Sequence, residues 1–528
     1  MVKKIALYDT TLRDGTQAEG VSFSLEDKLA IAARLDDLGF DYVEGGYPLS
    51  NEKDQAFFAR ARKLKLKKTR LTAFGMTRRR NTSAGADEGL AALLSARTPV
   101  VTIVGKSSEF QTRKILRVSG EQNLKMIADS IAFFAKRRGK EVIFDAEHFF
   151  DGYKDNPAYS LKCLTAAAEA GADLLCLCDT NGGSLPVEIE QITADIARAL
   201  PGVPLGIHCH NDAGLALAGS LAAVRAGAVQ VQGTINGLGE RCGNADLIEA
   251  AANLAFKMKR SVLRAGSLEK LTELSRCVYE LANMNPRENQ PFVGGSAYAH
   301  KGGMHVHAVR RNTRAYEHLQ PEKVGNVRRI LISELSGSSS VLAKTKLAPF
   351  QKDKALVRKV LREVARLENE GYQFEAAEAS FELILYKTLG RHRRFFELDH
   401  YRSVILKQDD REPVSEATVK LKVEKHWEHC VAEADGPVDA LSSACLKALL
   451  PYYPSLKNLR LIDYKVRVVN PRAGTAAKVR VTIEFRDPDR VFSTIGVSEN
   501  IIDATWGALT DAIEYKLLTE QGRIKTKE

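Results

Sequence analysis

Two histidines separated by one residue have the spacing of metal ligands. His208, Cys209 and His210 end a short apolar stretch with strand-like alternation. That alternation places both imidazoles on one face of the strand and the cysteine on the other. Two imidazoles on one face can bind one metal ion, and a hydrogen-bonded pair of structural histidines is the equal alternative for this motif alone.

Polar groups of a second kind follow the first predicted strand, in the segment Asp-Thr-Thr-Leu-Arg-Asp-Gly at residues 9–15. Asp14 can add a carboxylate to the two imidazoles and so form a facial metal site with positions open for substrate oxygens. Arg13 can hold a carboxylate or a developing alkoxide. The alternative for the segment 9–15 is an ordinary turn. The glycine-rich run 237–244 could also be an ordinary turn, or it could bring backbone donors and the Asn244 side chain to the same edge.

The spacing of the predicted strands indicates how these groups meet. In the first half of the chain, β-rich runs alternate with amphipathic stretches, as in a parallel sheet with crossover helices. The predicted strands cover residues 5–8, 42–44, 70–74, 100–104, 141–145, 174–177, 205–210 and 229–234. They recur about every 32 residues, the length of a βαβ step, so we expect a closed (β/α)8 TIM barrel, with an open doubly wound sheet as the minority alternative. Closure makes the first strand a neighbour of the eighth and brings Asp14 to the rim that carries the histidines.

The connecting segments agree with this model. Ser24 to Asp27 has the composition of a helix N-cap followed by an acidic first turn, and apolar residues then recur every three or four positions up to Gly39, which is expected to end the helix. We assign residues 1–265 to the catalytic barrel. Residues 266–374 are predicted to be mainly helical linker subdomains, and residues 375–528 a separate α+β domain.

Composition excludes several classes of protein. The 528 residues are 44% hydrophobic and 27% charged, which is typical of a globular chain rather than a disordered or fibrous one. No stretch approaches the roughly 20 apolar residues of a membrane helix, and the N-terminus has no secretory h-region, so we expect a cytoplasmic protein with no membrane partner. The eight cysteines include no Cys-x-x-Cys, which indicates reduced thiols.

The chain is basic, with a net charge of +11. Such a charge suits nucleic acid, and equally a polyanionic metabolite such as a nucleotide or coenzyme A (CoA). The basic runs at residues 60–70, 78–80 and 391–394 lack interleaved aromatic residues and any nucleic-acid motif. We therefore interpret them as solvated faces and expect no nucleic-acid partner.

Three motifs, in this order along the chain, resemble the barrel signatures of the DRE-type metallolyase superfamily: the segment 9–15, the run His-Cys-His-Asn-Asp at 208–212, and the run Gly-Leu-Gly-Glu-Arg-Cys-Gly-Asn at 237–244. Residues 492–502 resemble the regulatory domain of the 2-isopropylmalate synthases, in the family that also includes the homocitrate synthases. The resemblance implies that residues 375–528 are a regulatory domain of the LeuA type and that the linker subdomains at 266–374 complete the active site. Within that family, residues 74–79, residues 371–378 and the overall length are most similar to the citramalate synthases.

The resemblance implies a metal site. Asp14, His208 and His210 match the metal ligands of the family, and Asn244 matches a fourth contributor. Arg13 matches the residue that stabilises the oxyanion. The divalent cation would be Mn²⁺, Mg²⁺, Co²⁺ or Zn²⁺.

Further roles are implied for the groups around the substrates. Thr180 matches the residue that binds the oxo-acid carboxylate, although its position is also typical of a helix N-cap. Glu147 matches the general base, but the acidic pair common among isopropylmalate synthases is replaced here, and His148 is interpreted as a supporting residue. His305 and Tyr316 match a histidine and a tyrosine that the linker of one subunit supplies to the barrel of another, which implies a homodimer.

The implied reaction is a Claisen-type condensation of acetyl-CoA with pyruvate, followed by thioester hydrolysis to (R)-citramalate and CoA. It is the first step of a pyruvate route to isoleucine, and isoleucine is the expected feedback effector of the C-terminal domain. The nearest alternative is a 2-isopropylmalate synthase, which uses 2-oxoisovalerate in leucine biosynthesis. A lyase or aldolase on the same barrel is disfavoured by the long C-terminal region, and a basic nucleic-acid-binding protein is the alternative from another class.

Overall fold

The chain folds into two compact units in the computed structural model. The structure describes residues 3–332, 338–345, 347, 349, 350, 353–410, 412–469 and 477–521. One unit contains Met1–Tyr298 and Leu319–Val327, and the other contains Ala299–His318 and Arg328–Glu528. Of the helices in the described residues, none combines the length and the apolar character needed to cross a membrane.

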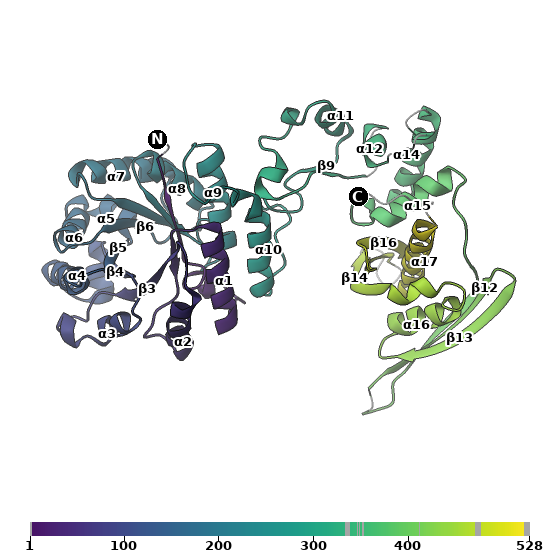
Figure 1. The fold of residues 1–528 in the computed structure, drawn as a ribbon, viewed down its shortest axis with the longest axis horizontal. Helices are drawn as coiled ribbons and strands as arrows, with labels where there is room; N and C mark the ends of the chain where they lie inside the picture. Colours follow the sequence, from purple (N-terminus) through teal and green to yellow (C-terminus); the bar gives the residue numbers. More distant parts are fainter. Residues whose placement is uncertain are drawn as a thin grey trace. The chain divides into compact units, whose positions relative to one another are not determined.

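A closed barrel of parallel strands forms the centre of the first unit (Figure 1). Its strands, in sequential order around the barrel, are β1 (Ala6–Asp9), β2 (Tyr42–Glu44), β3 (Arg70–Met76), β4 (Val100–Lys106), β5 (Glu141–Glu147), β6 (Leu174–Asp179), β7 (Leu205–Cys209) and β8 (Gln230–Gly233). β1 pairs with β8 from Ala6↔Gln230 to Asp9↔Gly233, which closes the barrel. The predicted (β/α)8 barrel is confirmed, and the open sheet is wrong.

Helices surround these strands on the outside of the barrel (Figure 1). They are α1 (Leu25–Leu38), α2 (Glu52–Ala61), α3 (Glu88–Ser95), α4 (Gly120–Ala135), α5 (Phe149–Asp155), α6 (Pro157–Glu169), α7 (Pro186–Ala199), α8 (Ala216–Arg225), α9 (Leu247–Phe256) and α10 (Leu271–Leu281). α1 begins as predicted, because Ser24 Oγ accepts from Asp27 N at 3.2 Å and the Asp27 carboxylate accepts from Ser24 N at 2.8 Å. Gly39 ends it in the left-handed region, with φ 86°.

The interior of the barrel contains an apolar cluster, which includes Val100, Ile143 and Leu174, and also a set of buried polar groups. Tyr8, Glu44, Asp145 and Gln232 are buried there. Gln232 Nε2 donates to Asp145 Oδ1 at 3.0 Å. Burial, followed by the charge of Glu44, raises the pKa of Asp145 to about 7. These polar side chains are therefore hydrogen-bonded to one another beneath the rim that carries the predicted ligands.

One basic run differs from its prediction as a solvated face. Arg79 and Arg80 are exposed, but Arg78 is only 5% exposed. Its guanidinium pairs with Asp129, with Nη2 2.8 Å from Oδ2. The prediction is wrong for Arg78 because this side chain folds back and bonds to its own loop.

The second unit joins a helical part to an α+β part. It contains β9 (Ala299–His300) paired with β10 (Arg329–Ile330), then α11 (Gly303–Arg311), α12 (Ser338–Lys344), α14 (Lys354–Asn369) and α15 (Glu378–Thr388). Two antiparallel sheets follow, made of β11 (Glu397–Leu406), β12 (Val414–Val423) and β13 (His426–Ala434), and of β14 (Arg460–Val468), β15 (Val479–Arg486) and β16 (Val491–Ser498). α16 (Pro437–Leu449) packs on the first sheet and α17 (Ile501–Glu520) on the second, as Figure 1 shows.

The capping box of α1 gives a stability prediction. Ser24→Ala removes the side-chain acceptor for Asp27 N and should lower the free energy of unfolding by about 1 kcal/mol. Ser83→Ala is the matched control, because Ser83 also precedes a helical turn but forms no side-chain cap hydrogen bond. Urea unfolding followed by circular dichroism measures both variants. Equal midpoints for the two variants would show that the cap contributes nothing.

The neutral carboxyl in the barrel interior predicts a dependence of stability on pH. Asp145 keeps its proton in the folded state up to about pH 7, whereas the unfolded side chain ionises from about pH 4. The stability from this group is therefore present below about pH 4 and is lost as pH rises to about 7, by up to about 1.4 kcal/mol per pH unit.

Asp145→Asn keeps an oxygen for Gln232 and removes this titration. Relative to the variant, the wild-type protein should lose stability between about pH 4 and 7 when urea unfolding is measured in EDTA. The exposed Asp155→Asn is the control and should follow the wild-type profile. Parallel profiles for wild type and Asp145→Asn would contradict a neutral Asp145.

Candidate active site

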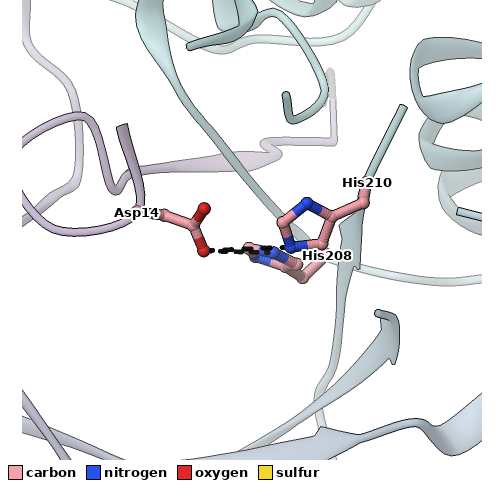
Figure 2. Close-up of side chains that lie close together, drawn as sticks. All are labelled: Asp14, His208 and His210. Carbon is pink, nitrogen blue, oxygen red and sulfur yellow. Dashed lines mark ion pairs between the residues drawn. The ribbon is translucent and has the colours of Figure 1, made fainter. Parts of the chain in front are cut away.

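Asp14, His208 and His210 point toward one another at the carboxyl-terminal rim of the barrel (Figure 2). Asp14 Oδ2 lies 3.9 Å from Nε2 of each histidine. One potential ligand atom from each of the three buried residues lies within 4.8 Å of the others. β7 ends at Cys209, whose side chain is buried in the apolar layer on the opposite face. The structure therefore brings together the three residues that barrel closure was expected to join.

The protonation of these groups suits a cation. Burial and the neighbouring histidine lower the pKa of His208 to about 3, and burial also lowers the pKa of His210. Burial alone would raise the pKa of Asp14, but Arg13 and the histidines outweigh it and lower this pKa to about 2. At neutral pH the site thus presents two neutral imidazoles and one carboxylate.

Gln232 orients one of the imidazoles. Its Oε1 lies 3.3 Å from Nδ1 of His208. Since the amide oxygen can only accept, the hydrogen belongs on Nδ1, and the lone pair on Nε2 faces Asp14. Gln232 was not among the residues predicted from the sequence, and the signal was weak, because a glutamine in a buried strand has many structural roles.

Asn244 lies beside Asp14. Its Nδ2 donates to Asp14 Oδ1 at 2.9 Å and to the Leu238 carbonyl at 3.1 Å. Among the described residues, no hydrogen-bond partner exists for the buried Oδ1 of Asn244. A buried amide oxygen without a partner next to two imidazoles and a carboxylate fits a divalent cation, since such ions accept N₂O₂ donor sets.

The glycines of the run 237–244 allow this close approach. A Cβ on Gly239 would lie 2.1 Å from Nδ2 of Asn244. Gly243 has φ 86°, and a Cβ there would lie 1.9 Å from the Gly237 carbonyl oxygen. The run is therefore a turn, and it also holds the Asn244 side chain beside Asp14.

Arg13 is fixed by contacts on three sides. Its Nη1 lies 2.7 Å from Asp14 Oδ2, and its Nε lies 2.5 Å from Glu44 Oε1. The Phe74 ring stacks on the guanidinium, with 3.9 Å between Cζ and the ring centroid. Glu44 also accepts from Tyr8 and Thr10. Sequence reasoning missed Glu44, although an acidic residue ending a fully buried strand was a usable signal.

A cavity of about 280 Å³ lies in front of these residues. The predicted residues in its wall are Arg13, Asp14, Glu147, Thr180, His208 and His210, and Phe74 and Val104 also line it. The Thr180 hydroxyl accepts from His148 N at 2.8 Å. The following helix begins at Pro186 with Leu185 as its N-cap, so the alternative interpretation of Thr180 as an N-cap is wrong.

Glu147 forms an ion pair inside this cavity. Its Oε2 lies 2.5 Å from Nζ of Lys106, which occupies the paired position on β4. Lys106 also lines the cavity and was not predicted from the sequence. A lysine at the end of a strand resembles any surface lysine, and only the register of β4 with β5 reveals its partner.

His305 and Tyr316 lie in the second unit. Their rings stack on each other, with centroids 4.2 Å apart. Tyr316 is exposed. The two residues thus form one aromatic pair, on α11 and on the turn that follows it.

Comparison with known proteins gives the family relationships of the chain. Residues 4–278 match the HMGL-like family, residues 292–372 match the homocitrate synthase post-HMGL domain-like family, and residues 375–517 match the LeuA allosteric (dimerisation) domain. A protein of Aquifex aeolicus named (R)-citramalate synthase is 51% identical, over 99% of both chains. Another of that name, from Geobacter sulfurreducens, is 50% identical over 97% of both chains.

A 2-isopropylmalate synthase of Methanocaldococcus jannaschii is more distant. It is 31% identical over 98% of this chain and 95% of its own length. The resemblance drawn from the three barrel motifs and the C-terminal stretch is therefore confirmed along the whole chain. The chain belongs to the HMGL-like family, and within it this chain is similar over nearly its full length to enzymes named (R)-citramalate synthase.

Proposed function

We propose that this protein condenses acetyl-CoA with pyruvate and hydrolyses the thioester to release (R)-citramalate and CoA. The observation that carries the proposal is the cluster of one carboxylate and two neutral imidazoles beside a fixed arginine in one cavity. The high identity to relatives named for this reaction supports the choice of acceptor. The reaction must remove a proton from a weakly acidic methyl group and must stabilise an alkoxide.

A divalent cation is part of this proposal. Asp14, His208 and His210 would hold it, with Asn244 as a fourth contributor, and Mn²⁺, Mg²⁺, Co²⁺ and Zn²⁺ all suit these donors. When bound, the cation supplies Lewis-acid polarisation of the oxo-acid carbonyl. Gln232 keeps the His208 lone pair directed to the site.

Arg13 stabilises the negative charge that develops on oxygen. Among the described residues, hydrogen-bond partners are found for its Nε and Nη1, in Glu44 and Asp14, which leaves Nη2 for a substrate oxygen. A donor that is already oriented costs little reorganisation during the reaction. Thr180 uses its oxygen to accept from His148 N, so its hydroxyl hydrogen is available for the carboxylate of the oxo acid.

Glu147 is the proposed general base. The ammonium group of Lys106 holds this side chain at the wall of the cavity. An ionised carboxylate can accept the methyl proton only when it faces the acetyl group, so substrate binding must compete with Lys106 for Glu147. Lys106 is then free to contact the thioester or the oxo acid.

The second unit completes the proposal. A homodimer, in which the linker of each subunit supplies His305 and Tyr316 to the barrel of the other, is supported by the match to the LeuA allosteric (dimerisation) domain. Isoleucine is the proposed feedback effector of the C-terminal domain, because citramalate formation would be the first step of a pyruvate route to this amino acid.

The acceptor preference tests the function. Release of free thiol from acetyl-CoA should be faster with pyruvate than with 2-oxoisovalerate, with kcat/KM differing by about 30-fold or more, because an isopropyl group adds at least about 2 kcal/mol of misfit to a pocket shaped for methyl. His208→Ala should abolish both turnover and binding of Co²⁺. A preference for 2-oxoisovalerate would assign the chain to the isopropylmalate reaction instead.

The base assignment has a separate test. Glu147→Gln should slow the exchange of acetyl protons with solvent deuterium by about 100-fold or more, while pyruvate binding measured by calorimetry persists. Glu240→Gln is the control, because Glu240 lines the same cavity and its carboxylate pairs, among the described residues, with the adjacent Arg241. Unchanged exchange in the Glu147 variant would transfer the role to His305.

A further inference from the structure

A second cavity, of about 450 Å³, adjoins the catalytic cavity. Met76, the last residue of β3, lines both. The walls of the second cavity combine apolar side chains with the three consecutive arginines Arg78, Arg79 and Arg80. These arginines form the basic run that the proposed chemistry leaves without a role.

The loop that carries the arginines is held by Arg78. Its Nη1 donates to the carbonyls of Arg79 at 3.1 Å, Arg80 at 3.4 Å and Thr82 at 3.1 Å, and its Nε donates to Asp129 at 2.9 Å. Arg78 N donates to Ser130 Oγ at 2.8 Å. Because the buried Arg78 guanidinium donates its hydrogen bonds to main-chain carbonyls, it fixes the backbone of the loop. The side chains of Arg79 and Arg80 therefore project from a rigid turn.

Those two side chains are available to an anion. Among the described residues, no hydrogen-bond or ion-pair partner is found for the Arg80 guanidinium. Arg79 makes one exposed pair, 3.3 Å from Glu88. The cavity also contains the Asp87 carboxylate, which accepts from Arg79 N at 2.9 Å and Leu90 N at 3.0 Å. The positive charge of the cavity therefore exceeds its negative charge.

The apolar wall suits a flat or flexible ligand. Met76 is 48% exposed and Leu49 is 38% exposed, and both line the cavity beside Tyr47. When a ligand covers large apolar side chains that are exposed to this extent, the burial of their surface from water stabilises the complex. A ligand that reaches here from the catalytic cavity must pass Met76.

A third cavity, of about 330 Å³, shares Arg13 and Phe74 with the catalytic cavity, but its cationic side chains are already engaged by neighbouring groups. Its buried Lys28 is paired with Asp54 at 2.5 Å, and its Lys53 donates to the Phe23 carbonyl at 2.8 Å. An anionic group is therefore favoured at the arginine turn rather than here.

We propose that the arginine-lined cavity binds the nucleotide end of CoA, with Arg79 and Arg80 on its phosphate groups and its adenine or pantetheine arm on the apolar wall. Arginine recognises phosphate through charge-assisted, bidentate hydrogen bonds. A thioester in the catalytic cavity places its long arm past Met76 and its phosphates at the turn. The inference rests on the proposed function, since it requires acetyl-CoA as the substrate.

The test compares two acyl donors. In the variant with both Arg79→Ala and Arg80→Ala, the KM for acetyl-CoA should rise about tenfold or more, whereas kcat/KM for S-acetylpantetheine, which has no nucleotide, should change by less than about twofold. The single Arg80→Ala variant should show a smaller rise. Arg138→Ala is the control, because Arg138 is also exposed but lies away from the cavity. An unchanged KM for acetyl-CoA would overturn the proposal.

Binding without turnover separates this inference from the proposed function. Adenosine 3′,5′-bisphosphate should bind the wild-type full chain in calorimetry and should bind the double variant at least about tenfold more weakly. Weaker binding to the double variant would support the phosphate site in this cavity, whether or not the wild type turns over acetyl-CoA with pyruvate. Absence of that turnover would contradict the proposed function and leave the phosphate site standing. A short oligonucleotide could instead bind more tightly than the bisphosphate and lose this binding in the double variant. That result would overturn the proposal and make the arginine turn a nucleic-acid-binding site.

Discussion

Pairing of the first strand with the eighth is the constraint on which the site depends. β1 and β8 run in parallel with Asp9 opposite Gly233, so the segments that follow them leave the barrel at the same rim. The two segments are then joined directly, because Ile235 N donates to Thr11 Oγ1 at 2.8 Å and Thr10 N donates to the Gly233 carbonyl at 2.9 Å. Asp14 and Asn244 meet for this reason, although they are far apart along the chain.

The charges at this rim compensate one another. Arg13 sits between the carboxylates of Asp14 and Glu44, and Tyr8 and Thr10 donate to Glu44 from the barrel interior. Buried ion pairs often add little net stability, because desolvation offsets their attraction. Their value here is geometric, since each partner restricts the rotamers of the next and the guanidinium is oriented before any substrate arrives.

The sequence was sufficient to predict the barrel and the proximity of Asp14 to His208 and His210. Strand spacing predicts the barrel because each βαβ step has a nearly constant length, and His208 and His210 share a face because strand side chains alternate. Residues that act through a partner could not be found this way. Glu44, Lys106 and Gln232 acquire their roles from strand register and from side chains on other strands.

The same limit explains the error at Arg78 and the alternatives at Thr180. A run of three arginines gives no sign that the first returns to its own loop, because that depends on Asp129 and Ser130 in α4. Thr180 precedes a helix in the sequence, but the helix begins only at Pro186. Local patterns predict elements well and predict the partners of single side chains poorly.

The low basicity of His208 and His210 affects how the site would be filled. Imidazoles in water carry protons below about pH 6.5, and a cation must displace them. Here burial keeps both rings deprotonated, His208 down to about pH 3. An incoming cation would displace fewer hydrogen ions from these two rings than from imidazoles in water, so its occupancy would depend less on a mild acidification of the cell.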